Sequence, residues 1–293
     1  MKILLTGAGG MLGSALWTEL SSSDHELIGT DLLQPACIPN EQFIQMDITH
    51  KAQTYQIVSK CNPDLIIHTA GYTDVDGCEI NQDHAYRVNG TGTRNLLLGA
   101  QRFDSGFLYI STDYVFGSDD KKSYREYDVQ KVNMHYAHSK QIGEEFVKSL
   151  SSKYYIVRSS WLFGKSRSNY VVSMIESIKH KKPYRAADDM TASPTYVVDL
   201  ARAVRYLIEQ ETYGVYHITN QGQASRYEVA CEIGAYLKSS NVSNIQQVKL
   251  DTLGLAAKRP HYSILENYMW HLEGNPPMRH WKDAVKDFIK EVS

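Results

Sequence analysis

Short apolar runs alternate with longer segments of helical periodicity through the first half of the chain. Several of the runs are nearly continuous in apolar residues, which is typical of strands covered on both faces. They span residues 2–6, 26–30, 42–46, 64–69, 106–111 and 154–159. The segments at 11–21, 51–60, 84–101 and 133–150 carry apolar residues every three or four positions, which predicts helices. This alternation predicts an α/β fold with a doubly wound parallel Rossmann sheet.

The alternation becomes less regular after about residue 160. Apolar spacing predicts helices at 169–180, 197–210, 225–238 and 281–292, and a strand at 214–220. No linker rich in Pro, Gly or Ser separates the two halves. We therefore expect a dinucleotide-binding Rossmann domain over residues 1–160. Residues 161–293 are expected to form mainly a smaller C-terminal substrate-binding lobe, interleaved with the first domain, that completes a substrate cleft.

Composition and charge argue against a nucleic-acid-binding protein, a disulfide-rich protein and a membrane protein. Of the 293 residues 42% are hydrophobic and 22% are charged, as in ordinary globular proteins, and the net charge is −2. No basic field therefore favours nucleic acid as a partner. The four cysteines are far apart in the sequence, which favours reduced thiols in the cytoplasm over a disulfide framework or a zinc site. The apolar run at the N-terminus is too short for a signal peptide or a membrane span.

A glycine-rich turn follows the first predicted strand. Gly7, Gly10 and Gly13 lie between that strand and the start of a helix. Glycines there permit a tight turn and let the backbone approach a pyrophosphate, which free N–H groups at the helix N-terminus can bind. The context predicts a dinucleotide site. The next strand ends at Asp31, whose carboxylate suits the ribose 2′-hydroxyl of NAD and repels a 2′-phosphate. NADH is therefore the expected cofactor, with NADPH as the alternative.

Two later strand ends offer further cofactor contacts. Asp47 and Ile48 follow the third predicted strand, where the adenine would lie. Thr69, Ala70 and Gly71 follow the fourth, and their small side chains would let the cofactor pass close to the backbone. Both groups lie at the edge of the sheet where open α/β folds bind their ligands.

Two tyrosine–lysine pairs with the same spacing compete as a proton-transfer device. A lysine ammonium near a phenol lowers the phenol pKa, and positions i and i+4 share one face of a helix. Tyr136 and Lys140 begin a segment with a sustained helical apolar stripe, in which Gly143 would relieve crowding at a close approach. Tyr127 and Lys131 lie in a stretch without such a stripe, which indicates a connecting loop. The pattern therefore favours the downstream pair.

A hydroxyl at the end of the fifth predicted strand supports this choice. Ser111, Thr112 and Asp113 fall at the carboxyl end of the sheet, where a hydroxyl could polarise a substrate oxygen. Alone, Thr112 would be interpreted as a strand-end cap and Tyr136 as a partly buried aromatic residue. Together with Lys140, and after a dinucleotide loop, they favour a catalytic interpretation.

Motifs along nearly the whole chain are similar to those of one family. They are "LLTGAGGMLGSAL", "HTAGYTDVDGCE", "YRVNGTGTRNL", "ISTDYVFG", "YAHSK", "VRSSWLFG", "SPTYVVDLA" and "AKRPHYSIL". With them the chain resembles an extended short-chain dehydrogenase/reductase, and within that superfamily it is most similar to the dTDP-4-dehydrorhamnose reductases. The glycine loop and the Tyr/Lys pair belong to the superfamily, whereas "STDYVF", "SSW" and the late "KRP" segment are more specific to the subgroup.

The resemblance implies NAD(P)H-dependent reduction of the C4 keto group of dTDP-4-dehydro-L-rhamnose to dTDP-L-rhamnose. It implies Tyr136 as the proton donor, with Thr112 and Lys140 completing the catalytic residues and Lys140 also holding the nicotinamide ribose. Arg259 suits the diphosphate, which a guanidinium binds bidentately. The implied cofactor contacts are Gly7, Gly10, Met11, Leu12, Gly13, Asp31, Asp47, Ile48, Thr69, Ala70, Gly71, Asn89, Tyr136 and Lys140. The implied substrate contacts are Thr112, Asp113, Tyr114, Trp161 and Arg259.

Other functions stay open at this point. The chain could reduce another 4-keto nucleotide sugar, since no pattern in it specifies the configuration of a single hydroxyl. A nucleotide-sugar 4,6-dehydratase would carry glutamate where Tyr114 stands, and epimerases generally lack the "TDYVF" pattern. The chain also resembles the non-catalytic, NAD(P)-binding regulatory subunit of methionine adenosyltransferase, which would bind the cofactor without turnover.

The expected partners follow from the same comparison. A dTDP-sugar is expected as substrate, with neither nucleic acid nor membrane as a partner, and a homodimer is left open. Some members of the family bind magnesium, but no set of ligands in this sequence matches such a site, so no metal is expected.

Overall fold

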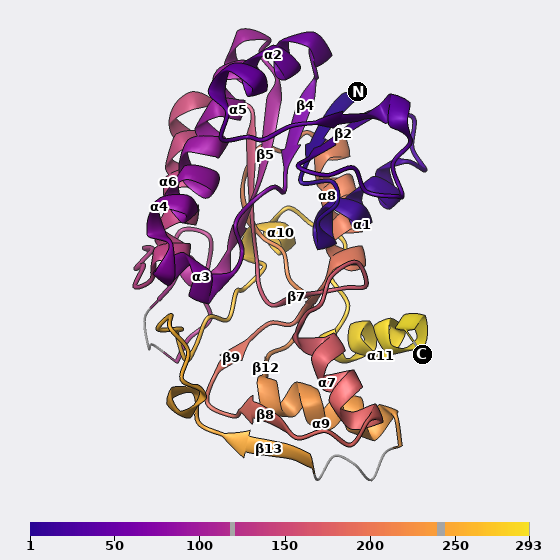
Figure 1. Cartoon of the computed structure of the whole chain (residues 1–293), viewed down its shortest axis with the longest axis vertical. Coiled ribbons are helices and arrows are strands. Elements are labelled where there is room, and N and C mark those ends of the chain that lie inside the picture. The colour runs from indigo at the N-terminus through magenta and orange to yellow at the C-terminus, as the bar shows by residue number, and fades with distance from the viewer. Residues whose placement is uncertain (118–120, 239–243, 293) are drawn as a thin grey trace.

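A parallel sheet of seven strands forms the upper half of the molecule (Figure 1). The computed structural model describes residues 1–117, 121–238 and 244–292. The strand order is β11-β6-β5-β4-β1-β2-β3, and each neighbouring pair is parallel. The strands are β1 (Lys2–Thr6), β2 (Glu26–Asp31), β3 (Phe43–Gln45), β4 (Leu65–His68), β5 (Gly106–Thr112), β6 (Tyr154–Ser159) and β11 (Gly214–His217). The order reverses between β1 and β4, the point where such sheets bind ligands.

Helices cover both faces of this sheet, because alternate strand residues point to opposite sides. Ile3 and Leu5 of β1 pack in a core with α1 (Met11–Leu20) and α8 (Val197–Gln210). Leu4 packs in a second core, formed with helices on the other face. Those helices are α2 (Lys51–Cys61), α5 (Thr93–Arg102) and α6 (His135–Leu150). The predicted doubly wound α/β fold is confirmed.

The segment between β4 and β5 holds more structure than its sequence pattern predicts. One helix was expected at 84–101, and the structure has α4 (Gln82–Ala85), a π-helical stretch at Tyr86–Gly92 and then α5. A short helix, α3 (Val75–Ile80), precedes them, and Asp74 caps it by accepting a hydrogen bond from Gly77 N. π-Helical turns occur frequently at functional sites, and this one carries Asn89.

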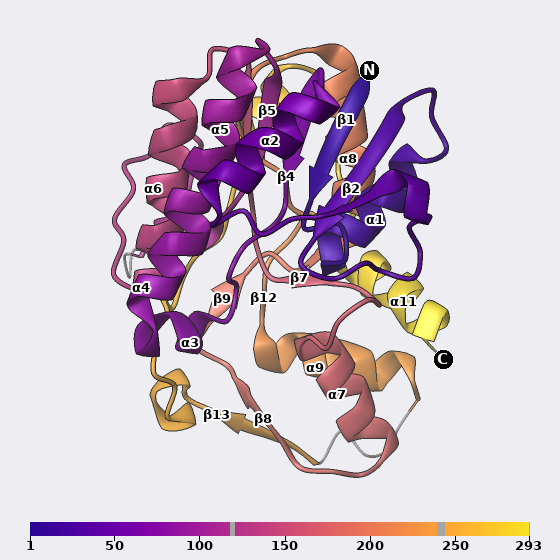
Figure 2. The same cartoon turned by 45° about the horizontal axis from the view of Figure 1, so that its top comes forward.

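The lower half of the molecule has its own apolar core (Figures 1 and 2). Ile175, Ile233 and Phe288 join α7 (Tyr170–Lys179), α9 (Arg226–Tyr236) and α11 (Trp281–Val292). Pairs of short strands surround this core: β7 (Leu162–Phe163) with β10 (Thr195–Tyr196), β9 (Thr191–Ala192) with β12 (Ala224–Ser225), and β8 (Tyr184–Ala187) with β13 (Ile245–Val248). The remaining elements are α10 (Tyr268–Leu272) and the 3₁₀ turns at Asn40–Gln42, Asp113–Val115 and Leu250–Leu253. β11 and α8, although late in the sequence, pack with the large sheet.

Periodicity predicted the long elements and missed the short ones. The six strands expected in the first half and the strand expected at 214–220 all lie in the large sheet. The helices expected at 169–180, 197–210, 225–238 and 281–292 are α7, α8, α9 and α11. Strands of two residues, such as β7 and β12, are too short to show a period. Across the described ranges, no helix is long and apolar enough to cross a membrane.

Candidate active site

The predicted phosphate loop joins β1 to α1 in the expected geometry. Gly7 has a φ of +70°, and a Cβ there would lie 2.5 Å from Ala70 N. A Cβ on Gly13 would lie 2.0 Å from Gly7 O. Helix α1 starts at Met11 without a side-chain cap, so the first N–H groups of the helix, including that of Leu12, are available to an anion. The turn thus fits a pyrophosphate, with Gly10 as the residue before the helix.

Asp31 lies beside this loop at the end of β2. Its Oδ2 accepts a hydrogen bond from Gly9 N at 2.9 Å, and its Oδ1 accepts one from Leu32 N at 2.7 Å. These bonds fix the carboxylate, and each oxygen keeps a second lone pair. A partly exposed acid held in this way is placed to accept from a ribose hydroxyl.

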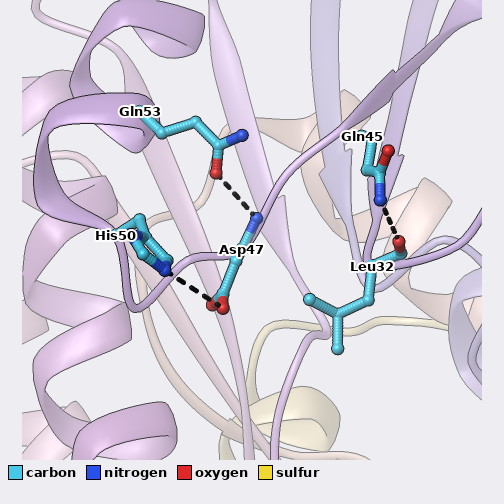
Figure 3. A pocket seen from close by; sticks show the side chains of 5 residues that line it. All are labelled: Leu32, Gln45, Asp47, His50 and Gln53. Atoms are coloured by element: carbon cyan, nitrogen blue, oxygen red, sulfur yellow. Dashed lines mark hydrogen bonds and ion pairs between the residues drawn. The ribbon is translucent and has the colours of Figure 1, made fainter.

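A pocket of about 400 Å³ opens beside the ends of β2 and β3 (Figure 3). It is lined by Leu32, Gln45, Asp47, His50 and Gln53. The Asp47 carboxylate accepts from the backbone and side chain of Thr49, and Asp47 N donates to Gln53 Oε1 at 3.1 Å. The next residue, Ile48, is buried. Asp47 therefore lines a pocket where the sequence predicts the adenine.

The loop after β4 is held against β1 and α6. Thr69 Oγ1 donates to Thr6 O at 2.7 Å, which leaves Ala70 and Gly71 beside the glycine turn. Asn89, from the π-helical stretch, accepts from Tyr72 N at 2.8 Å and donates to Tyr72 O at 3.0 Å.

The Asn89 amide also contacts α6, the helix that carries Tyr136 and Lys140. Its Nδ2 donates to Ser139 Oγ at 2.9 Å, and Ser139 Oγ donates to the Tyr136 carbonyl. Asn89 is buried, so its amide links the cofactor loop to α6. This positioning role was not visible in the sequence.

The three predicted catalytic residues come from two elements that pack together. Thr112 ends β5, whereas Tyr136 and Lys140 lie one turn apart on α6. The Thr112 hydroxyl lies close enough to the Tyr136 phenol to lower its pKa. Thr112 Oγ1 also donates to Asp113 Oδ1 at 3.1 Å and accepts from Tyr114 N at 3.2 Å. The end of β5 and the start of α6 thus place Thr112 near Tyr136.

The upstream tyrosine–lysine pair, Tyr127 and Lys131, lies outside α6. Tyr127 is 63% exposed in a segment without helix, where it hydrogen-bonds to Arg125 and packs edge-on against Tyr268. Lys131 pairs through its backbone with Val115. The expectation that this stretch is a connecting loop is confirmed.

Burial sets the charge states of the site. Burial first, and the Asp113 carboxylate second, raise the pKa of Tyr136 above its usual value, while the Thr112 hydroxyl lowers it. Burial lowers the pKa of Lys140 to about 7, against an upward effect of Glu144. Lys140 Nζ lies 4.0 Å from the centre of the Tyr109 ring, a cation–π distance. The site therefore holds a protonated phenol and, one turn along α6, a lysine that titrates near neutral pH. The prediction of a lowered tyrosine pKa is wrong, because burial outweighs the other effects on Tyr136.

Asp113 is buried behind Thr112 and joins three segments of the chain. Its carboxylate accepts from Thr112, from Ser160 Oγ at 3.2 Å and from Ser263 Oγ. Burial raises its pKa to about 6, although the three hydroxyls oppose this shift. Ser160 and Ser263 were not singled out by the sequence, and their distance from Asp113 along the chain gives no local signal.

Three predicted substrate residues surround this centre. The Tyr114 ring meets the Tyr136 ring edge-on, with centroids 6.3 Å apart. Trp161 is buried and has a φ of +47°, a conformation that costs a bulky residue free energy and is typical of functional sites. Arg259 forms a bidentate ion pair with Asp76, at 3.0 and 2.8 Å. The guanidinium predicted to bind a diphosphate is thus already paired with a carboxylate.

The described part of the chain holds no group of three or more His, Cys, Asp or Glu side chains that could bind a metal ion. The predicted dinucleotide is a different case. The glycine turn, in which an added Cβ would clash, and the uncapped start of α1 suit its pyrophosphate.

Comparisons with known proteins agree over the full chain. The family model described as RmlD substrate binding domain matches residues 1–293. The spore coat polysaccharide biosynthesis protein SpsK of Bacillus subtilis is 34% identical over 293 residues, which cover 100% of this chain and 98% of that protein.

Solved structures give the same family. A dTDP-4-dehydrorhamnose reductase from Clostridium acetobutylicum has a TM-score of 0.92 and 35% identity, covering 100% of this chain and 99% of that one. The dTDP-4-dehydrorhamnose reductase from Bacillus anthracis, solved in complex with NADP, has a TM-score of 0.87 and 36% identity, covering 99% of each chain.

The fold and the site define an NAD(P)-dependent oxidoreductase of the short-chain dehydrogenase/reductase class. The match over the whole chain also identifies the family within this class. The chain belongs to the dTDP-4-dehydrorhamnose reductase family.

The position of Asp31 predicts a preference for NADH over NADPH. We expect a higher kcat/KM with NADH, because the carboxylate accepts from a 2′-hydroxyl and repels a 2′-phosphate. Asp31→Asn should reduce the ratio of the two kcat/KM values roughly 10-fold, the effect of one charged hydrogen bond. Asp24→Asn, at an exposed position, is the control and should leave the ratio unchanged. A wild-type preference for NADPH would contradict this role of Asp31.

Proposed function

We propose that this protein uses NADH to reduce the C4 keto group of dTDP-4-dehydro-L-rhamnose, giving dTDP-L-rhamnose. The observation that carries the proposal is the placement of Thr112 at the end of β5 near Tyr136, with Lys140 one turn along α6, in a chain of this family. Bound through the Gly7–Gly13 turn, Asp31 and the loop at Thr69–Gly71, the cofactor supplies the hydride. NADPH is the alternative cofactor, and the relative from Bacillus anthracis was solved with NADP.

The side chains supply the proton and stabilise charge. As the C4 oxygen gains negative charge, Tyr136 hydrogen-bonds to it and gives up its proton, and Thr112 donates to it by turning its one hydroxyl proton away from Asp113. The raised pKa of Tyr136 keeps the phenol protonated until a strongly basic oxygen forms beside it. Lys140, when protonated, stabilises the phenolate that remains. Asp113 holds the Thr112 hydroxyl in place.

The substrate contacts are proposed in the same way. Tyr114 and Trp161 shape the sugar pocket, because both belong to the apolar cluster against which Tyr136 packs. Arg259 contributes positive charge near the diphosphate while it stays paired with Asp76. We also propose residues 1–160 as the cofactor domain and 161–293 as mainly the substrate lobe, a cytoplasmic location and, as an open alternative, a homodimer.

A coupled assay tests the reaction. The 4-keto sugar is generated from dTDP-glucose with the upstream dehydratase and epimerase, this protein is added, and NADH absorbance and the product sugar are followed. We expect loss of absorbance with dTDP-L-rhamnose as product. An epimeric product would show that the protein is a reductase but acts on a different 4-keto sugar. Cofactor binding without turnover would instead support the regulatory-subunit alternative.

The two tyrosines give a matched pair of variants. Tyr136→Phe should lower kcat by roughly 10² to 10⁴, the range for loss of a general acid. Tyr127→Phe removes the same hydroxyl from an exposed loop and should be nearly silent. Damage from the Tyr127 substitution, or wild-type activity of Tyr136→Phe, would show that the proton comes from another group.

The Lys140 pKa of about 7 predicts the pH profile. A lysine is charged below its pKa and neutral above it, so kcat/KM should fall as pH rises through about 7, by about tenfold per pH unit. Lys140→Arg keeps its charge throughout and should lack this fall, although its rate will be lower. Lys131→Arg is the control and should keep the wild-type profile. The same fall in Lys140→Arg as in the wild type would assign the titration to another group.

A further inference from the structure

Arg226 lies in the angle between the rings of Trp161, a proposed substrate contact, and Tyr170. Its guanidinium carbon is 3.6 Å from the centre of the Trp161 ring and 3.5 Å from that of Tyr170. The two rings are inclined by 67°, with centroids 5.8 Å apart. Such contacts are favourable for a guanidinium and fix its plane. Arg226 therefore has a defined position although it belongs to no ion pair among the described residues.

The rings contact the face of the guanidinium, and the Tyr170 hydroxyl interacts with one of its N–H groups. Arg226 Nη1 is buried and has no hydrogen-bond partner in the described part of the chain. The indole Nε1 of Trp161 is also buried, and it faces the Tyr114 hydroxyl. The buried Arg226 Nη1 thus lacks an acceptor, an arrangement that costs free energy unless a ligand supplies acceptor atoms.

The position of Arg226 in the fold makes its charge unusual. It is the first residue of α9, and a helix dipole disfavours a cation at this end. Figure 2 shows β12 leading down into α9 from the upper half of the molecule. Three other arginines with buried or partly buried side chains each face a carboxylate: Arg158 with Glu144 at 2.7 Å, Arg259 with Asp76 at 2.8 Å and Arg279 with Asp199 at 2.7 Å.

Tyr114 connects Arg226 to the catalytic centre. The Arg226 and Arg259 charges both act on Tyr114, and its ring meets that of Tyr136. Of the two arginines, Arg259 is neutralised by Asp76, so the unbalanced positive charge near Tyr114 belongs to Arg226. A group that only donates hydrogen bonds and carries an unbalanced charge suits an anionic ligand.

We propose that Arg226 binds the diphosphate of the nucleotide-sugar substrate, with the Trp161 indole N–H as a second donor. The inference rests on the proposed function, because the diphosphate is the anionic part of that substrate. Trp161 then acts through its edge, since Arg226 covers a ring face. Arg259, paired with Asp76, positions the segment that carries it and is the weaker of the two diphosphate contacts.

Binding of product fragments tests this assignment. Calorimetric titration of the NAD⁺-saturated protein with dTDP and with thymidine isolates the contribution of the phosphates. We expect Arg226→Gln to weaken dTDP binding roughly 10- to 100-fold, the effect of losing charged hydrogen bonds, and to leave thymidine binding unchanged. Arg185→Gln is the matched control, since it removes an exposed arginine of the same lobe and should change neither affinity. Arg259→Gln, measured in parallel, should have the smaller effect on dTDP.

Each remaining outcome has a defined meaning. Wild-type affinity for dTDP in Arg226→Gln would overturn the inference, as would an equal loss for dTDP and thymidine. Should Arg226→Gln fail to fold, Arg226→Lys replaces it, since lysine keeps the charge but loses the planar stacking and the forked donors. Arg226→Lys should weaken dTDP binding by less than roughly 10-fold, and unchanged dTDP affinity in this variant would also overturn the inference. A wild-type protein that binds NAD⁺ but prefers thymidine to dTDP would instead contradict the proposed substrate class.

Discussion

Helix α6 lies directly on strand β5, and a glycine at position 143 permits this contact. A Cβ there would lie 2.2 Å from the Tyr109 hydroxyl and 3.0 Å from the backbone oxygen of Asn89. The Tyr109 hydroxyl donates instead to the Lys140 carbonyl at 3.3 Å. This approach sets the distance between helix and sheet. Because Thr112 ends the same strand and Tyr136 lies on the same helix, the contact at Gly143 also sets the geometry of the proposed proton transfer.

The same packing explains why the lysine titrates near neutral pH. Lys140 is buried against Tyr109, and the acid one turn along the helix, Glu144, is hydrogen-bonded twice to Arg158, at 2.9 and 2.7 Å. With its charge balanced by Arg158, Glu144 raises the pKa of Lys140 by less than burial lowers it. An acid that is close but already paired thus leaves Lys140 able to titrate.

Sequence patterns predicted the features that lie within one segment of the chain, and missed the contacts between segments that are far apart in the sequence. The glycine turn, the strand-end Thr112 and the i, i+4 pair on α6 are local signals, as is the need for a small residue at Gly143. The large sheet follows from runs long enough to show a period. Arg226 gives no local signal, because the rings that it contacts, those of Trp161 and Tyr170, come from other segments of the chain. The Asp76–Arg259 pair joins residues 183 positions apart, and a π-helical turn such as that holding Asn89 does not alter the apolar spacing that predicts a helix.

Two acids of the first half of the chain bind side chains of one late segment. Arg259 binds Asp76, at the start of α3, and Ser263 donates to Asp113, directly after Thr112. Asp76 follows the proposed cofactor loop at Thr69–Gly71. Asp113 accepts a hydrogen bond from Thr112, whose hydroxyl is proposed to be catalytic. A displacement of this segment would therefore break contacts behind both groups at once. In this arrangement Arg259 is required mainly for the position of its segment, whereas Arg226, with no carboxylate partner among the described residues, keeps its charge for a ligand.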